Sequence, residues 1–183
     1  MRGKKIFLKK ATKKDLNIIK DWRNSRGVRE YNTQYTLLNI KNQKTWFVNI
    51  SKTNSKRKMF MIFSKKNEPI GICGLIDIDK KNRNAEVSII LGEQKYRGKG
   101  YGVESLHLLV KYGFKKLKLH NISAKIIEYN KISIKLFEKA DFKIDAILRD
   151  CIWRYGRWWN ILQYSLLEND FYNKKITTNT HIH

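Results

Sequence analysis

The chain has 183 residues, of which 42% are hydrophobic and 12% aromatic, and 39 Lys and Arg against 16 Asp and Glu give it a formal charge of +23 at pH 7. This length and apolar content suit one domain with a buried core, which excludes a disordered basic tail. The charge permits a nucleic-acid-binding module, but 29 of the 39 basic residues are Lys. Lys lacks the planar guanidinium with which Arg forms paired hydrogen bonds to phosphate and guanine. We therefore interpret most of the positive charge as solvated surface and do not expect a nucleic-acid partner.

The hydrophobic pattern predicts a single mixed α/β (α+β) domain. Residues 5–10 alternate as in a strand, and 12–22 and 39–51 have the periodicity of amphipathic helices, the second with Ile40, Trp46, Phe47 and Ile50 turned inward. The later predicted elements are a hairpin of 59–64 and 69–79, a strand 85–91, a helix 101–119, a strand 122–129, a helix 131–140, and a hairpin of 142–152 and 158–167. This order predicts a largely antiparallel sheet with one parallel crossover.

The ends of the chain and its cysteines indicate where the protein works. The predicted domain spans 1–168, and the polar end 169–183 is predicted to be frayed or disordered. Cys73 and Cys151 form neither a metal-ligand spacing nor a disulfide framework, which is typical of a reducing compartment. No apolar run approaches the ~18 residues of a membrane span, and no signal-peptide core follows the N-terminal charges. We therefore expect a cytoplasmic protein without a membrane partner.

A glycine-rich stretch, RGKGYG at 97–102, joins a predicted strand directly to a predicted helix. Glycines let consecutive backbone N–H groups face one concavity, and a helix N-terminus adds partial positive charge, so the stretch predicts a phosphate cradle with Arg97 and Lys99 at its mouth. Two common cradles are excluded by the spacing. A dinucleotide fingerprint would need Gly at Val103, and a nucleotide-triphosphate loop would need Ser or Thr at Gly100.

The pattern R-x-x-G-x-G, formed by Arg97, Gly100 and Gly102, resembles the acetyl-coenzyme-A loop of the GNAT superfamily of N-acetyltransferases. Further along, NKISIKLFEKADF at 130–142 resembles that family's segment N-x-x-[AS]-x-x-[LI]-[YF]-E-K-x-G-F. The strand around Glu86 and the closing hairpin are similar to the branch that contains ribosomal-protein N-terminal, spermidine and nucleotide-linked amino-sugar acetyltransferases. The resemblance covers roughly residues 5–167 and implies a twisted, mostly antiparallel sheet of about seven strands with a central splay, flanked by about four helices.

The resemblance implies acetyl-CoA as co-substrate and no metal. The end of the strand at 85–91 would pair with the pantetheine arm, the loop amides would hold the pyrophosphate, and the start of the helix at 131–140 would lie beside the thioester. The implied coenzyme-binding residues are Ile89, Ile90, Leu91, Arg97, Gly98, Lys99, Gly100, Tyr101, Gly102, Asn130, Ser133 and Lys139.

Glu86 is the candidate catalytic base, because an attacking amine must lose a proton and this carboxylate lies in an apolar stretch. The alternative is a structural carboxylate bonded to Arg83 or to the backbone. Many family members have Tyr where this chain has Phe137, and Phe has no proton to give to the leaving thiolate. Water, Tyr129 or Tyr31 are the alternative proton donors, unless the thiolate leaves unaided.

The resemblance places the acceptor pocket beneath the first two helices and the closing hairpin. The candidate substrate-binding residues are Trp22, Arg23, Asn24, Arg29, Tyr31 and Trp153. Residues 1–83 hold 22 basic and 6 acidic residues, a net charge of +16, so we expect an anionic small-molecule amine as partner. A nucleotide-linked amino sugar fits best, ahead of a protein N-terminus and then a polyamine.

Two alternatives stay open at this point. The aromatic stretch CIWRYGRWW at 151–159 can serve core packing, a stacking platform for a sugar or base, or a homodimer contact. A non-enzymatic module that binds nucleic acid through the glycine-rich loop is the alternative to an acetyltransferase.

Overall fold

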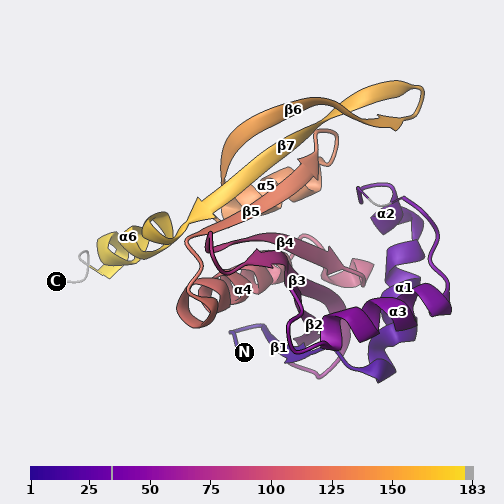
Figure 1. Cartoon of the computed structure of the whole chain (residues 1–183). Helices are drawn as coiled ribbons and strands as arrows, with labels where there is room; N and C mark the ends of the chain where they lie inside the picture. The colour runs from indigo at the N-terminus through magenta and orange to yellow at the C-terminus, as the bar shows by residue number, and fades with distance from the viewer. Residues whose placement is uncertain (34, 180–183) are drawn as a thin grey trace.

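The computed structural model describes residues 1–33 and 35–179, and Figure 1 shows how they are arranged. The strands are β1 (Ile6–Lys10), β2 (Lys58–Ser64), β3 (Pro69–Asp79), β4 (Asn84–Leu91), β5 (Asn121–Ile127), β6 (Lys143–Arg154) and β7 (Arg157–Leu167). The helices are α1 (Leu16–Asn24), α2 (Arg26–Arg29), α3 (Ile40–Ser51), α4 (Tyr101–Leu117), α5 (Lys131–Lys139) and α6 (Glu168–Asn179), with 3-10 turns η1 (Lys13–Asp15) and η2 (Gln94–Tyr96). None of the helices in these ranges combines the length and apolarity that a bilayer crossing needs.

The strands form one sheet in the order β1-β2-β3-β4-β5-β7-β6. Neighbours are antiparallel except β4 and β5, which run parallel because the crossover helix α4 connects them. The predicted mostly antiparallel sheet of seven strands with one parallel crossover is therefore confirmed. The hairpin of β6 and β7 is long, and its tip reaches over α2 (Figure 1).

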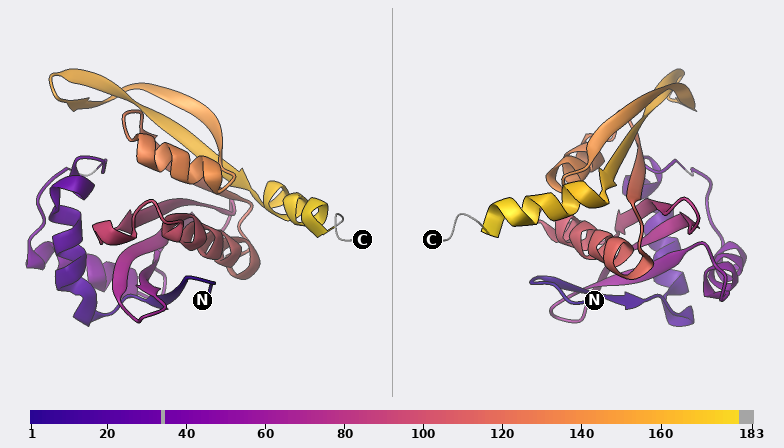
Figure 2. Two further views of the ribbon diagram at one scale, coloured as in Figure 1. Left: turned by 180° about the vertical axis from the view of Figure 1, so that it is seen from behind. Right: turned by 60° about the vertical axis from the view of Figure 1, so that its left-hand side comes forward.

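Alternation along the strands gives the sheet two apolar faces. Met61 joins a cluster with Ile19 and Trp22 of α1, whereas the next residue, Ile62, joins a larger cluster with Phe114 of α4. One face of the sheet is therefore covered by α1 and α3 and the other by α4, as the two views of Figure 2 show. The α1 and α3 side is the face on which the acceptor is expected.

The first helical region differs from its prediction. Residues 13–15 form η1, capped by the bonds of Thr12 to the Asp15 carboxylate, and α1 begins only at Leu16. The helix then stops, because Ser25 has an extended backbone that separates α1 from α2. The inward position predicted for Ile40 is wrong, since Ile40 is 39% exposed and the buried face of α3 starts one turn later.

The chain after β7 also differs from the frayed end predicted for 169–183. Residues 168–179 form α6, because aromatic side chains anchor its first turn: Phe171 packs 5.4 Å from the ring of Phe114. Lys143 of β6 adds an ion pair with Asp170 at 3.1 Å. Residues 180–183, which belong to the same prediction, lie outside the described residues.

Candidate active site

The strands β4 and β5 pair only where they begin. Their parallel register ends with Glu86 opposite Ser123. Beyond this point β4 continues along β3 and β5 continues along β7, so the two inner edges diverge (Figure 1). The predicted splay is present, and the backbone of 87–91 that faces it, including Ile89, Ile90 and Leu91, has no strand partner on that side. Such an edge suits an extended arm with amide groups.

The loop between β4 and α4 leads into a helix start whose first backbone N–H groups have no helical partner. Gly98 and Gly100 have φ of 73° and 84°, which glycine adopts at little cost, and Gly100 caps α4 without any side-chain bond. The first hydrogen bond of the helix runs from Glu104 N to Gly100 O, so the N–H groups of residues 101–103 have no partner within α4. Free N–H groups and the positive end of the helix dipole attract phosphate. The loop thus fits the pyrophosphate of a coenzyme.

Arg97 faces the end of β4, although the sequence predicts it at the mouth of the loop. Its Nε donates to Leu91 O at 3.0 Å, and the guanidinium also approaches Gly92 O at 3.5 Å. Trp22 supports the same corner from α1, where its Nε1 donates to Glu93 Oε1 at 2.9 Å. A Cβ on Gly92 would lie 2.1 Å from the Trp22 ring, so only glycine fits there. These contacts hold the loop against the end of β4.

Lys5 brings a further positive charge to the loop. Its Nζ donates to Lys99 O at 3.0 Å, and its backbone N–H donates to the Glu104 carboxylate at 2.9 Å. The N-terminal segment therefore crosses the first turn of α4. Nothing in the sequence distinguishes Lys5 from the other lysines, because the contact joins residues 94 positions apart.

The start of α5 lies at the far side of the splay. Asn130 is 7% exposed and caps the helix, its Oδ1 accepting from Ser133 N at 3.1 Å, while its Nδ2 donates to Tyr31 O at 3.4 Å. Lys139, in the last turn of α5, is exposed. Phe137 is 4% exposed and packs edge-on against Phe142 at 5.0 Å, so it belongs to the core.

Glu86 is positioned where the splay begins. Its Oε2 lies 3.1 Å from Nζ of Lys125 on β5, and 23% of its side chain is exposed. The alternative partner, Arg83, directly precedes β4 and instead donates to Lys118 O and to Glu168. The side chain alternates with Ala85 and Val87, which pack on α4, so Glu86 points to the face covered by α1 and α3. It is placed to meet an amine that arrives on that face.

Arg154, at the end of β6, joins the hairpin to the segment after α2. The residue is 8% exposed, and its guanidinium donates to Glu30 O, Asn32 O and Thr33 O at 2.6 to 3.1 Å. It also donates to the Tyr129 hydroxyl at 2.9 Å, which itself donates to Glu30 O at 2.6 Å. Tyr129 thus has a structural role in this arrangement. We call these contacts of Arg154 the clamp. The sequence does not predict the clamp, because it shows only an Arg within an aromatic hairpin.

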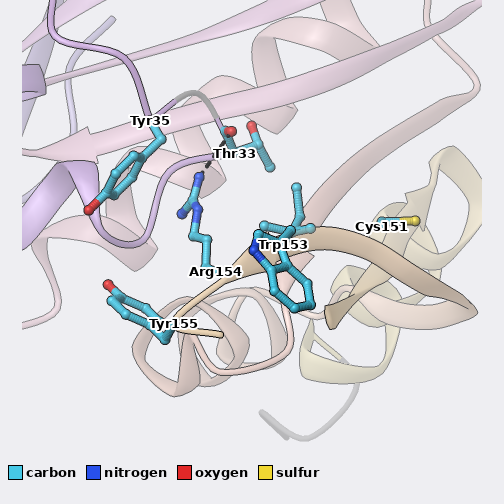
Figure 3. A pocket seen from close by; sticks show the side chains of 7 residues that line it. Thr33, Tyr35, Cys151, Trp153, Arg154 and Tyr155 are labelled. Atoms are coloured by element: carbon cyan, nitrogen blue, oxygen red, sulfur yellow. Dashed lines mark hydrogen bonds between the residues drawn. The ribbon is translucent and has the colours of Figure 1, made fainter. Parts of the chain in front are cut away.

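A pocket of about 490 Å³ lies beside this clamp, and Figure 3 shows its lining. The lining residues are Thr33, Tyr35, Cys151, Ile152, Trp153, Arg154 and Tyr155. Trp153, which the sequence analysis names as a candidate substrate-binding residue, is 57% exposed there. Tyr155 belongs to the aromatic stretch 151–159 that the sequence offers as a stacking platform, whereas Tyr35 was not predicted. Both side chains are exposed.

The other predicted substrate residues divide into two groups. The side-chain amide of Asn24 donates to Leu38 O and accepts from Leu38 N. The fold therefore already uses both ends of this amide. Arg23 and Arg29 are half-buried and Tyr31 is 39% exposed. Burial and the like charge of Arg57 lower the pKa of Arg23. The Arg29 guanidinium lies 5.2 Å from the Tyr35 ring, and its Nε has no hydrogen-bond partner among the described residues.

One segment on this side of the molecule carries charged residues of positive sign only. Residues 31–67 contain eight Lys and Arg and no Asp or Glu. The segment includes α3 and the chain that Arg154 holds. A polycation approaching this side meets repulsion, and an anion meets attraction. Within the described ranges, no three His, Cys, Asp or Glu side chains gather as a metal site.

Comparisons with known proteins agree with this geometry. The family model described as the acetyltransferase (GNAT) domain matches residues 5–143. An uncharacterized N-acetyltransferase of Bacillus licheniformis is 34% identical over 122 residues, which cover 67% of this chain and 68% of the relative. The spermidine N(1)-acetyltransferase of Vibrio cholerae is 23% identical over 169 residues, 92% of this chain and 96% of that protein.

The fold is similar to that of solved structures. The crystal structure of spermidine N-acetyltransferase from Vibrio cholerae in complex with CoA and spermine superimposes with a TM-score of 0.83 at 22% identity, covering 92% of this chain and 99% of that one. The family match spans most of the sheet, the glycine-rich loop and α5. This chain therefore belongs to the GNAT family of acetyltransferases, enzymes that take their acetyl group from acetyl-CoA.

Proposed function

We propose that this N-acetyltransferase acts on the primary amine of a small anionic acceptor, which enters on the face covered by α1 and α3. The observation that carries the proposal is the position of Glu86 at the start of the splay, on that face. Bound acetyl-CoA supplies a thioester, so that an amide C–N bond forms while the C–S bond breaks and the CoA thiol leaves. The backbone edge of 87–91 and the N–H groups of 101–103 orient the coenzyme.

Glu86 takes the proton of the amine in this proposal. An ammonium group cannot attack a carbonyl, and a carboxylate at hydrogen-bond distance can remove its proton. Lys125 holds the carboxylate at 3.1 Å and orients it toward the splay. No side chain is assigned to protonate the thiolate, since Phe137 has no proton and Tyr129 donates to Glu30 O. Water serves that step.

The charge of this chain supports an anionic acceptor, of which a nucleotide-linked amino sugar is the best candidate. The 31–67 segment has no carboxylate to hold a polycation. Arg29 keeps an unpaired Nε that can donate to a phosphate, and the rings of Trp153 and Tyr155 offer a surface for a sugar or base. Each of these features suits a diphosphate-linked amine.

A polyamine is the second candidate, and the comparisons support it more than they support an amino sugar. The named relative and the superimposed structure are both spermidine acetyltransferases, at 23% and 22% identity. At such identity the acceptor residues can differ while the fold is kept. The charge of residues 31–67 and the sequence relatives thus favour different acceptors.

A thiol-release assay with acetyl-CoA decides between them. We expect UDP-glucosamine to have a kcat/KM at least about fivefold above that of spermidine or of a peptide with a free N-terminus, because one repelled charge pair costs about 1 kcal/mol or more. UDP-N-acetylglucosamine, whose amine is already blocked, is the matched control and should release no thiol. Higher activity with spermidine would replace the amino sugar by the polyamine.

Binding of the coenzyme is measured separately. Saturating acetyl-CoA should raise the free energy of unfolding by about 2–4 kcal/mol, because it binds the folded chain alone. Stabilisation by an oligonucleotide without any by acetyl-CoA would instead support the nucleic-acid module.

A further inference from the structure

Gln43 of α3 is buried, yet the fold makes no use of its amide. Its side chain is 0% exposed, and neither Nε2 nor Oε1 has a hydrogen-bond partner among the described residues. Leaving a buried polar group unpaired costs about 1–3 kcal/mol, so native proteins rarely do so without a reason. Of the four such side-chain atoms in the described ranges, three belong to Gln43 and Arg29. The unpaired groups therefore gather on the side where the acceptor is expected.

The position of Gln43 connects it with the face that carries Glu86. Gln43 shares the inward face of α3 with Trp46 and Ile50, which lie three and seven residues further on. Both pack on the cluster beneath α1, which extends to Ile76 and Ile90 of the sheet.

Ile76 and Ile90 lie on the same face of the sheet as Glu86, the candidate base. Ile76 pairs with Glu86 across β3 and β4, and Ile90 points to the same face of β4 because it is four residues from Glu86. Gln43 thus lies on the face of α3 that packs toward this cluster, and the cluster reaches the Glu86 face of the sheet.

We infer that Gln43 binds the acceptor and helps to determine its specificity. The inference rests on the proposed function, since this layer is the acceptor side only if the amine arrives on the Glu86 face. An amide offers both N–H donors and a carbonyl acceptor, so it suits a neutral group that also donates and accepts. A sugar hydroxyl is such a group, whereas the ammonium groups of a polyamine only donate. Gln43 therefore selects a hydroxyl-bearing acceptor.

The test is the substitution Gln43→Leu, which keeps the size of the side chain and removes its polar atoms. Because the amide has no partner in the fold, the variant should unfold in urea with a free energy at least equal to that of the parent. With UDP-glucosamine, the KM should rise about tenfold or more, while the Kd for acetyl-CoA stays within about twofold. Asn121→Leu is the matched control, since Asn121 Oδ1 is also buried and unpaired but lies at the start of β5. It should leave the KM unchanged.

Each other outcome overturns the inference. An unchanged KM in the folded Gln43→Leu variant removes Gln43 from the acceptor site. Loss of stability or failure to fold shows that the amide has a structural partner, such as a water molecule. An equal loss of affinity for acetyl-CoA shows a general disturbance. If the parent turns over none of the three acceptors, the proposed acceptor fails, and the inference for Gln43, which rests on it, is overturned with it.

Discussion

Nζ of Lys125 lies 3.1 Å from Oε2 of Glu86, and the pair spans the point where β4 and β5 part. Two strands that pair for three residues and then diverge leave the facing backbone edges of their next residues without a strand partner. The ion pair links β4 to β5 at the narrow end of the splay. It also holds the Glu86 carboxylate at the start of the splay, where the proposed function requires the base.

The substitution Glu86→Gln tests the base. We expect kcat to fall about a hundredfold near pH 7, a typical effect of removing a general base. The loss should shrink toward about pH 10, because the amine then loses its proton unaided. The kcat pH profile is the measurement. Lys125→Met is the control for the ion pair: it keeps the carboxylate that acts as the base, so its kcat should fall less than that of Glu86→Gln. A Glu86→Gln profile with the shape and height of the parent's would exclude Glu86 as the base.

Two glycines with the same backbone conformation allow an effect on coenzyme binding to be distinguished from an effect of backbone strain. Gly98 has φ of 73° in the loop before α4, and Gly156 has φ of 74° in the turn between β6 and β7. Neither would place a Cβ within 4 Å of another atom. Each Gly→Ala change should lower the free energy of unfolding by about 1–2 kcal/mol, the cost of a left-handed residue with a side chain.

Only Gly98→Ala should also weaken acetyl-CoA binding, since only that loop carries the free N–H groups. Isothermal titration with acetyl-CoA measures the Kd of both variants. Equal affinities in the two would contradict a phosphate cradle at 97–102.

Arg154 should contribute far more stability than Arg157 on the same hairpin. Arg154→Met leaves three backbone carbonyls without their donor, so we expect the free energy of unfolding to fall by about 2–3 kcal/mol. Arg157 instead stacks on the Trp159 ring at 3.4 Å, and its replacement by Met should cost about 0.5–1 kcal/mol. Urea unfolding of the two variants gives the comparison, and equal losses would refute the clamp.

The two cysteines should differ in reactivity. Cys73 is 0% exposed in β3 and burial raises the pKa of its thiol, whereas Cys151 is exposed on β6. Since the thiolate is the nucleophile, iodoacetamide at about pH 8 should modify Cys151 alone in the folded protein. Mass spectrometry of the intact chain counts the modified thiols. Cys151→Ser should show no modification until urea unfolds it; labelling of the folded Cys151→Ser variant would mean that β3 opens.

The local patterns of the chain were sufficient to predict most of the elements. Residues a few positions apart determine a helix face such as that of Leu106, Val110 and Phe114, or a turn such as that of Gly98 and Gly100. The family resemblance likewise rested on short spacings and led to the splay and the coenzyme loop. The end of the chain was mispredicted because α6 depends on Phe171 reaching Phe114, a contact that no local pattern contains.

By itself, the sequence determined the α/β class of the fold and a strongly positive N-terminal half, and it predicted an acetyl-CoA loop at 97–102, because periodicity, charge and glycine spacing are properties of neighbouring residues. Only the tertiary structure decided how individual side chains are used. It turned Arg97 to the end of β4, paired Glu86 with Lys125, gave Arg154 the carbonyls of residues more than a hundred positions away, and enclosed the Gln43 amide without a partner. Such contacts depend on which strands and helices become neighbours, and that follows from packing of the whole chain.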